Sequence, residues 1–502
     1  MLEIMDTTLR DGEQTSGVSF SGQEKLNIAR LLLNDLGVNR IEIASARVSN
    51  GEFKTVKDIA DVAIATNNID KIEILGFIDN GESIKWIHEA GCRNINLLTK
   101  GSYSHVTEQL RKTPEQHLED IKREIAIAQE YGIGVNIYLE DWSRGMSNSE
   151  DYVYFLMDGL HNQPIKRFML PDTLGILNPH TTWKFCRKMI NRYPELHFDF
   201  HAHNDYDLAV ANTMVAVEVG VKGIHLTING LGERAGNATM SSVIAVLHDQ
   251  LKIRTSIRED QINNVSRIVE GCSGQLISSN QPIIGNNVFT QCAGIHADGD
   301  NKNNLYYNEL IPERFGRQRE YALGKLSGKA NIRKNIDALG IQLTEEQMRI
   351  ITDRVIELGD KKEIITQSDL PFIINDVIHN STEQKIEIVR FHSSISKGLR
   401  PTATVRIRIN GEEYEDTSAG KGQYHAFSKV LWKIYSKLAK PKPELVNYSV
   451  AIPPGGRTDA LVQTIITWKF KEKVFKTHGL DVDQVEAAVK ATEKMLNIIE
   501  DL

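Results

Sequence analysis

The sequence predicts an α/β protein with a TIM barrel, a helical linker region and a C-terminal α+β domain. Eight short segments rich in β-branched residues alternate with amphipathic stretches over the first half of the chain. Eight such pairs in about 250 residues are typical of a barrel. Polar residues follow nearly every segment at its C-terminal end. A doubly wound sheet is the alternative, but it would gather its polar residues at a single switch point.

Each expected strand is short, and a stretch with helical spacing of apolar residues separates it from the next. The strands are expected at 2–9, 39–45, 71–77, 94–99, 134–141, 167–172, 197–203 and 223–230. The first helix is clearly marked, because Ser21 and Glu24 form a capping-box sequence ahead of Leu26 and Ala29. We therefore expect the barrel to occupy residues 1–260.

The rest of the chain is expected to form two further regions. Residues 261–383 lose the strand alternation and predict helical linker subdomains, in which the polar segment 296–310 is a functional loop. Residues 384–502 become strand-rich again, and Asn410-Gly411 between two alternating segments is a strong hairpin signal. Strands closed by a helix occur twice here, which predicts a small α+β domain with internal pseudo-symmetry.

Composition excludes several classes of protein. The chain has 502 residues, of which 41% are hydrophobic and 25% charged, and a net charge of −7 without a long basic tract. This argues against nucleic acid and anionic membranes as main partners. No apolar segment approaches the roughly 18 residues of a membrane span. The four cysteines show no CxxC spacing, so we expect a reducing, cytoplasmic location rather than a disulfide framework.

The segment DTTLRDGEQ at residues 6–14 follows the first expected strand directly. A strand ending normally carries Gly, Pro or Asn at such positions. Here one turn contains the polar residues Asp6, Arg10, Asp11, Glu13 and Gln14. Any one of them alone is usually a solvated turn residue. Together they indicate a site for a metal ion and a carboxylated substrate.

A second polar group lies on the seventh expected strand, where His201 and His203 are two residues apart and share one face. Two imidazoles alone are often only polar strand-end residues. With the Asp11 carboxylate at the neighbouring strand end they form a divalent metal site that leaves coordination positions open, as catalytic sites do. Asn237, in the glycine-rich segment 229–237, is a further candidate ligand. The residues do not distinguish Mg, Mn, Co and Zn.

Four motifs in this order resemble the DRE-TIM metalloenzyme family: DTTLRDGEQ at 6–14, HAHND at 201–205, NGLGERAGN at 229–237 and AGIHADG at 293–299. The resemblance covers essentially the whole chain. It points to the Claisen-condensing branch of isopropylmalate, citramalate and homocitrate synthases, and within it to the citramalate-forming group. It implies an acyltransferase that condenses acetyl-CoA with pyruvate in isoleucine biosynthesis. The alternative is condensation with 2-oxoisovalerate in leucine biosynthesis.

The resemblance also implies individual roles. Asp11, His201 and His203 would bind the metal, Arg10 would polarise the 2-oxo group, Thr173 would hold the substrate carboxylate, and Glu140 would stabilise this arrangement. His296, with Asp298 and Tyr306, would be the acid/base group that acts on acetyl-CoA. Leu75, Leu98 and Tyr138 match positions that close the substrate pocket around a methyl group, although leucines on barrel strands are usually ordinary core residues.

Assembly and regulation are implied in the same way. Relatives are dimers whose linker segments cross between subunits, so we expect a homodimer with shared active sites. Isoleucine or leucine is the expected effector, near the glycine turns at 420–422 and 455–456. His425 stands where an acidic residue is expected, which tempers this expectation. Rival hypotheses are a lyase or carboxyltransferase on the same barrel and a non-catalytic amino-acid sensor.

Overall fold

The computed structural model describes residues 2–292, 296, 299, 305, 307–324, 327–339, 341–360, 370, 374, 385–451, 462–481 and 483–500. The chain divides into two compact units. The first comprises Met1–Thr290 and Tyr307–Glu320, and the second comprises Gln291–Tyr306 and Tyr321–Leu502. Among the described residues, no helix has the length and apolar character needed to cross a membrane.

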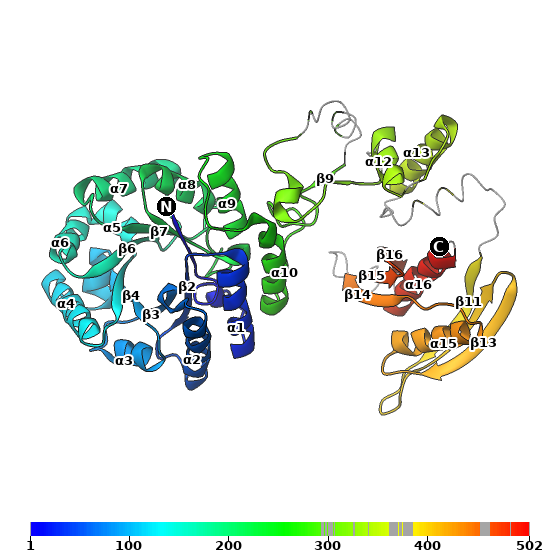
Figure 1. Cartoon of the computed structure of the whole chain (residues 1–502), viewed down its shortest axis with the longest axis horizontal. Coiled ribbons are helices and arrows are strands. Elements are labelled where there is room, and N and C mark those ends of the chain that lie inside the picture. Colours follow the sequence, from blue (N-terminus) through cyan, green and yellow to red (C-terminus); the bar gives the residue numbers. More distant parts are fainter. Residues whose placement is uncertain are drawn as a thin grey trace. The chain divides into compact units, whose positions relative to one another are not determined.

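The first unit contains a closed barrel of eight parallel strands in sequential order (Figure 1). The strands are β1 (Glu3–Asp6), β2 (Arg40–Ser45), β3 (Ile72–Gly76), β4 (Asn94–Lys100), β5 (Gly134–Glu140), β6 (Ile165–Asp172), β7 (Phe198–Ala202) and β8 (Gly223–Leu226). All eight lie within or overlap the expected segments. Pairing of β1 with β8 closes the ring, with Met5 beside His225. The predicted TIM barrel is confirmed.

Helices surround the barrel and cover the outer face of its strands (Figure 1). They are α1 (Gly22–Arg30), α2 (Asn50–Ala65), α3 (Glu82–Glu89), α4 (Pro114–Glu130), α5 (Trp142–Asn148), α6 (Glu150–Leu160), α7 (Pro179–Arg192), α8 (Ala209–Val219), α9 (Met240–Asp249) and α10 (Ile262–Ser273). The predicted capping box is present at the start of α1. Ser21 Oγ accepts from the Glu24 backbone N–H at 3.3 Å, and Glu24 Oε2 accepts from the Ser21 backbone N–H at 2.7 Å.

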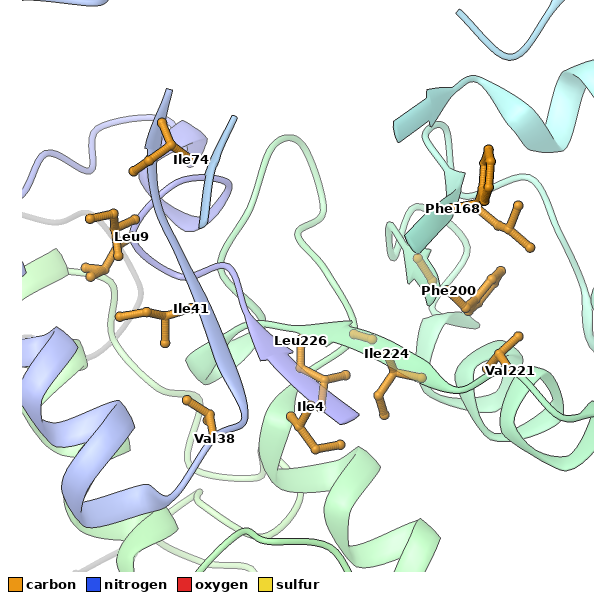
Figure 2. Packing of buried hydrophobic residues seen from close by; sticks show 14 of the residues in the cluster. Ile4, Leu9, Val38, Ile41, Ile74, Phe168, Phe200, Val221, Ile224 and Leu226 are labelled. Carbon is orange, nitrogen blue, oxygen red and sulfur yellow. The ribbon is translucent and has the colours of Figure 1, made fainter. Parts of the chain in front are cut away.

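The outward-facing side chains of the strands are apolar and pack against the helices. Ile4, Ile41, Ile74, Phe200 and Ile224 belong to one large buried cluster, as Figure 2 shows. Since side chains alternate along a strand, the residues between them point into the barrel. Burial of the outer face therefore fixes which residues line the interior.

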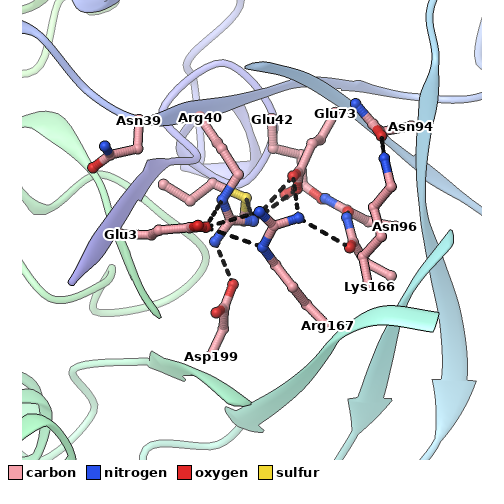
Figure 3. Close-up of polar contacts among 12 residues, drawn as sticks. Glu3, Asn39, Arg40, Glu42, Glu73, Asn94, Asn96, Lys166, Arg167 and Asp199 are labelled. Atoms are coloured by element: carbon pink, nitrogen blue, oxygen red, sulfur yellow. Dashed lines mark hydrogen bonds and ion pairs between the residues drawn. The ribbon is translucent and has the colours of Figure 1, made fainter. Parts of the chain in front are cut away.

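The interior is largely polar, whereas barrel interiors are usually filled by Val, Ile and Leu. Near the N-terminal ends of the strands, Arg40 forms ion pairs with Glu3 and Glu73, both at 3.0 Å, and with Asp199 (Figure 3). Arg167 donates to Glu3 at 2.9 Å from the opposite side of the barrel. These charges are stable in the interior because each has a partner of opposite sign.

Replacement of Arg40 by Met is expected to destabilise the barrel by about 3–5 kcal/mol, because the buried carboxylates of Glu73 and Asp199 lose their main cation. Calorimetric unfolding of the full chain measures this. The matched control is Arg406→Met, which breaks an exposed pair with Glu415 in the second unit and should leave the free energy of unfolding almost unchanged, because exposed ion pairs contribute little. Equal effects of the two substitutions would contradict the predicted importance of the interior charges.

The second unit contains α12 (Lys329–Ala338) and α13 (Glu345–Asp360), which pack on each other through Ile332, Ile336 and Ile351. The helical content expected for the linker region is therefore present in this part. A short sheet of β9 (Thr290–Gln291) and β10 (Glu320–Tyr321) is present as well, and no sequence pattern indicated it. Strands of two residues are too short to show an alternating pattern.

The C-terminal domain repeats one arrangement twice, as predicted. Its elements are β11 (Ile386–Ser394), β12 (Thr402–Ile409), β13 (Glu412–Ala419), α15 (Gln423–Lys437), β14 (Glu444–Ala451), β15 (Val462–Phe470), β16 (Lys473–Asp481) and α16 (Gln484–Glu500). The β12–β13 hairpin turns at Asn410-Gly411, and both residues have positive φ as a type I′ turn requires. Phe427 and Trp468, one from each half, belong to the same buried core.

Candidate active site

The turn after β1 presents Arg10 and Asp11 to the interior. The Thr7 carbonyl accepts hydrogen bonds from the backbone N–H groups of both residues, at 3.2 and 2.9 Å, which tightens the turn. Asp6 accepts from the Thr8 backbone at 2.9 Å, and burial raises the pKa of Asp6 to about 7. Glu13 pairs with Lys25 of α1 at 2.7 Å. Asp6 and Glu13 thus hold the turn, whereas Arg10 and Asp11 face the site.

Asp11 meets the two histidines of the HAH segment. His201 Nε2 lies 3.2 Å and His203 Nε2 lies 3.8 Å from Asp11 Oδ2. One potential ligand atom from each of the three residues lies within 4.8 Å of the others, and all three residues are buried. Strands β1 and β7 are separated only by β8, so the barrel brings together side chains that are far apart in sequence.

The chemistry of this group suits a divalent cation. Asp11 Oδ1 and Asn237 Oδ1 are buried acceptors without a hydrogen-bond partner among the described residues, which is costly unless a ligand satisfies them. The backbones of His203 and Asn237 form a β-bridge, so Asn237 lies next to the histidines. Burial opposes ionisation of Asp11, but Arg10 and His201 hold its pKa well below the usual range. Burial lowers the pKa of His203 to about 4. At neutral pH, Asp11 and His203 therefore already have the protonation states that metal binding requires.

Arg10 is held in three directions. Its Nε donates to Glu42 at 2.6 Å, one terminal nitrogen pairs with Asp11 at 3.3 Å, and the other donates to the Tyr138 hydroxyl at 3.3 Å. Glu42 is fully buried on β2 and also accepts from Asn96 at 2.7 Å. The guanidinium plane is thereby fixed beside the candidate metal site of Asp11, His201 and His203. Glu42 was not among the site residues predicted from the sequence.

The three predicted pocket residues lie together inside the barrel. Leu75 and Tyr138 form a small buried cluster with Met5 and Met169, and Leu98 packs against it. This cluster is separate from the large core outside the strands. The ring centroid of Tyr138 lies 6.1 Å from that of His201, so the apolar cluster borders the candidate metal site.

Tyr138 has a further contact that sequence reasoning missed. Its hydroxyl lies 2.9 Å from Nδ1 of His225, which is fully buried on β8. Burial lowers the pKa of His225 to about 3, so its imidazole is neutral. Burial also raises the pKa of Tyr138, which remains a phenol. A usable sequence signal exists, since a histidine between Ile224 and Leu226 must face the interior.

The remaining predicted residues occupy different surroundings. Thr173 Oγ accepts from the Asp141 backbone N–H at 2.9 Å, which leaves its own proton available. Glu140 ends β5 and pairs with Lys100. It also lines a polar cavity of about 440 Å³ together with Ser104, His105, Glu108, Gln109 and Arg144. His296 belongs to the second unit. Asp298 and Tyr306 lie outside the described residues.

Comparison with family models shows to which family the chain belongs. The HMGL-like model matches residues 1–269. These residues include the whole barrel and the group of Asp11, His201 and His203. The chain belongs to the HMGL-like family. The resemblance inferred from its four motifs is confirmed. Two further models match the remainder of this HMGL-like chain: the homocitrate synthase post-HMGL domain-like model at residues 283–363 and the LeuA allosteric (dimerisation) domain at residues 364–500.

Full-length relatives of this HMGL-like protein have two kinds of name. A putative (R)-citramalate synthase of Archaeoglobus fulgidus is 34% identical over 99% of both chains. The (R)-citramalate synthase of Methanocaldococcus jannaschii is 33% identical, again over 99% of both chains. A probable 2-isopropylmalate synthase of Methanopyrus kandleri is 34% identical over 99% of this chain and 98% of its own. Overall identity to these relatives therefore does not distinguish between the two names.

Proposed function

We propose that this protein is an acyltransferase that condenses acetyl-CoA with pyruvate to give (R)-citramalate and CoA. The observation that carries the proposal is the wall of Leu75, Leu98 and Tyr138 beside the Asp11, His201 and His203 group. Such a wall fits the methyl group of pyruvate and crowds a branched side chain. Full-length relatives named citramalate synthase support this choice.

Asp11, His201, His203 and Asn237 would hold a divalent ion, which when bound supplies a Lewis acid for the oxygens of the 2-oxo acid. The residues around it have complementary tasks. Arg10 donates to the ketone oxygen as negative charge develops there. Thr173, whose oxygen already accepts from Asp141, donates its proton to the substrate carboxylate. Glu140, paired with Lys100, stabilises the rim of the site.

His296 is the proposed base, supported by Asp298 and Tyr306. It takes a proton from the methyl group of acetyl-CoA, and the resulting carbanion adds to the ketone carbon of pyruvate. The ketone π bond opens to an alkoxide beside Arg10, to which a proton is then returned. Water then cleaves the thioester and releases CoA. We further propose a homodimer through the LeuA domain, with each site completed by the partner's linker region.

Turnover is expected to favour pyruvate over 2-oxoisovalerate by at least about tenfold, because two additional methyl groups must enter the crowded pocket. CoA release measured with a thiol reagent gives kcat/KM for each acid. Leu98→Ala is expected to narrow the preference, whereas Leu251→Ala, outside the pocket, should leave it unchanged. Equal turnover of both acids would instead favour the second candidate, a 2-isopropylmalate synthase, which the Methanopyrus kandleri relative supports.

We also propose feedback regulation by isoleucine or leucine through the C-terminal domain. A cavity of about 430 Å³ lies where α15 and α16 begin, lined by Gly422, Gln423, Tyr424, His425, Leu445, Tyr448, Asp483, Gln484 and Val485. The N-terminus of a helix suits the carboxylate of an amino acid. Asp483 offers a carboxylate that can bind the ammonium group of the amino acid, whereas His425 has no negative charge for this contact. Gly455 and Gly456 lie outside the described residues.

Isoleucine or leucine at millimolar concentration is therefore expected to reduce turnover at least about fivefold, the lower end of typical allosteric coupling. Asp483→Asn should weaken this response, whereas Glu472→Gln, in the turn after β15, should preserve it. Turnover measured against a titration of each amino acid, with valine as a third, tests the expectation. A full-length enzyme that responds to none of the three would remove the regulatory proposal and leave the catalytic one standing.

A further inference from the structure

The Tyr138 hydroxyl has two polar neighbours among the described residues, and the hydroxyl can accept a hydrogen bond from one and donate one to the other. His225 Nδ1 lies 2.9 Å away, and a terminal nitrogen of Arg10 lies 3.3 Å away. An arginine can only donate, so the Tyr138 oxygen accepts from Arg10. The direction of the hydroxyl proton therefore depends on which nitrogen of His225 is protonated.

Asp199 determines the tautomer of His225. His225 Nε2 lies 3.1 Å from Asp199 Oδ2, and the same oxygen accepts from Arg40. An ionised carboxylate can only accept, so the proton of the neutral imidazole lies on Nε2. Nδ1 then has a free lone pair, and the Tyr138 hydroxyl donates to it. The hydroxyl proton consequently points toward His225 in the polar interior of the barrel rather than toward the substrate pocket.

The barrel leaves space for this arrangement at one specific position. A Cβ atom at Gly223 would lie 2.0 Å from Asp199 Oδ1 and 3.1 Å from an Arg40 nitrogen. Only glycine at this point of β8 admits the carboxylate next to the guanidinium. Gly223 lies two residues before His225, so one strand provides both the space for Asp199 and the imidazole that it orients.

We propose that His225, oriented by Asp199, is a positioning residue that turns the Tyr138 hydroxyl proton away from the substrate pocket. As a result, the pocket selects 2-oxo acids with an apolar side chain. The inference rests on the proposed function, because it concerns the same 2-oxo acid. A substrate hydroxyl entering this pocket loses its hydration and finds no donor on Tyr138. The same hydrogen bond steadies the oxygen on which Arg10 is anchored.

Two amide substitutions separate the contacts of His225. In His225→Asn, Oδ1 replaces Nδ1 and still accepts from Tyr138. In His225→Gln, the amide reaches Asp199, but no acceptor remains at the position of Nδ1, so the Tyr138 proton is free to turn toward the pocket. The control is His161→Gln, at the exposed end of α6. The measurements are KM and kcat for pyruvate and for hydroxypyruvate, KM for acetyl-CoA, and pyruvate affinity by calorimetry.

The proposal expects His225→Gln to raise the KM for pyruvate about tenfold with an unchanged KM for acetyl-CoA, and to reduce discrimination against hydroxypyruvate by about tenfold, since one hydrogen bond is lost and one gained. His225→Asn should stay within about threefold of the wild type, as one neutral contact is kept. Equal effects of Asn and Gln, or a loss of kcat with both KM values unchanged, would overturn it.

Tyr138→Phe keeps the test decisive if His225→Gln does not fold. Under this proposal, the wild-type pocket of Leu75, Leu98 and Tyr138 already offers the substrate no hydrogen-bond donor. Removal of the hydroxyl should therefore leave discrimination against hydroxypyruvate within about threefold of the wild-type value. A change of about tenfold or more would show that the hydroxyl faces the substrate and would overturn the proposal. A wild-type enzyme that releases no CoA with pyruvate refutes the proposed function itself, which is a different outcome.

Discussion

Removal of divalent metal is expected to abolish CoA release completely, and readdition of a divalent cation is expected to restore it. Asp11, His201 and His203 bring three potential ligand atoms to within 4.8 Å of one another, and one buried oxygen of Asp11 has no hydrogen-bond partner in the described part of the chain. Without a cation the 2-oxo group loses its Lewis acid. Chelation followed by titration of the stripped protein with Mg, Mn, Co and Zn measures both activity and stoichiometry.

A single substitution makes the same prediction more specific. His203→Ala is expected to weaken metal binding by at least about 10–100-fold, the loss that even an outer-shell partner causes. Calorimetry with the metal alone measures this without reference to turnover. The control is His161→Ala, which lies outside the site. Full activity of the stripped protein, or unchanged metal affinity of His203→Ala, would refute the assigned site.

Arg10→Lys is expected to lower kcat by about 100–1,000-fold, the usual effect of removing one donor to a developing oxyanion. A lysine ammonium is a point charge and cannot reach Glu42, Asp11 and Tyr138 with the fixed geometry of a guanidinium. Steady-state kinetics with pyruvate measures the effect, and circular dichroism checks the fold.

The matched control for this prediction is Arg144→Lys, since Arg144 pairs with Asp141 near the rim and is more than one-third exposed. Glu42→Gln provides a second test because Glu42 orients Arg10. The effects of Arg10→Lys and Glu42→Gln should be less than additive if the two residues act as a unit. An Arg10→Lys enzyme within about threefold of the wild type would exclude the proposed role of Arg10.

Most of the fold follows from patterns that a sequence displays locally. The eight strands were predictable because Ile41, Ile74 and Phe200 alternate with interior residues, and the helix α1 because Ser21 and Glu24 cap it. Once a barrel is assumed, residues at the strand ends must meet at one rim. Grouping of Asp11 with His201 in β7 and His203 directly after it was therefore predictable as well.

The partners of buried polar residues were not predictable in the same way. Glu42, Asp199 and His225 each interrupt an apolar strand at an interior position, so the sequence contained a signal of a polar interior. The pattern does not indicate which cation each carboxylate faces, because that depends on strand register and side-chain conformation. Glu140 shows the same limit: its rim position was expected, but its pairing with Lys100 was not.

The polar contacts inside the barrel form a closed circuit, which runs through Arg10, Glu42, Asn96, Asn136, Arg167, Glu3, Arg40, Asp199, His225 and Tyr138. This restricts how the protein can change over generations. A mutation of Arg40 or Asp199 alone leaves a buried charge without its partner. These two positions can therefore change only together, with a second substitution that restores the charge balance. Leu75 and Leu98 lie outside the circuit and can vary singly. Directed evolution toward larger 2-oxo acids should therefore recover single substitutions at the two leucines. Substitutions among the residues of the circuit should be recovered only in coupled pairs.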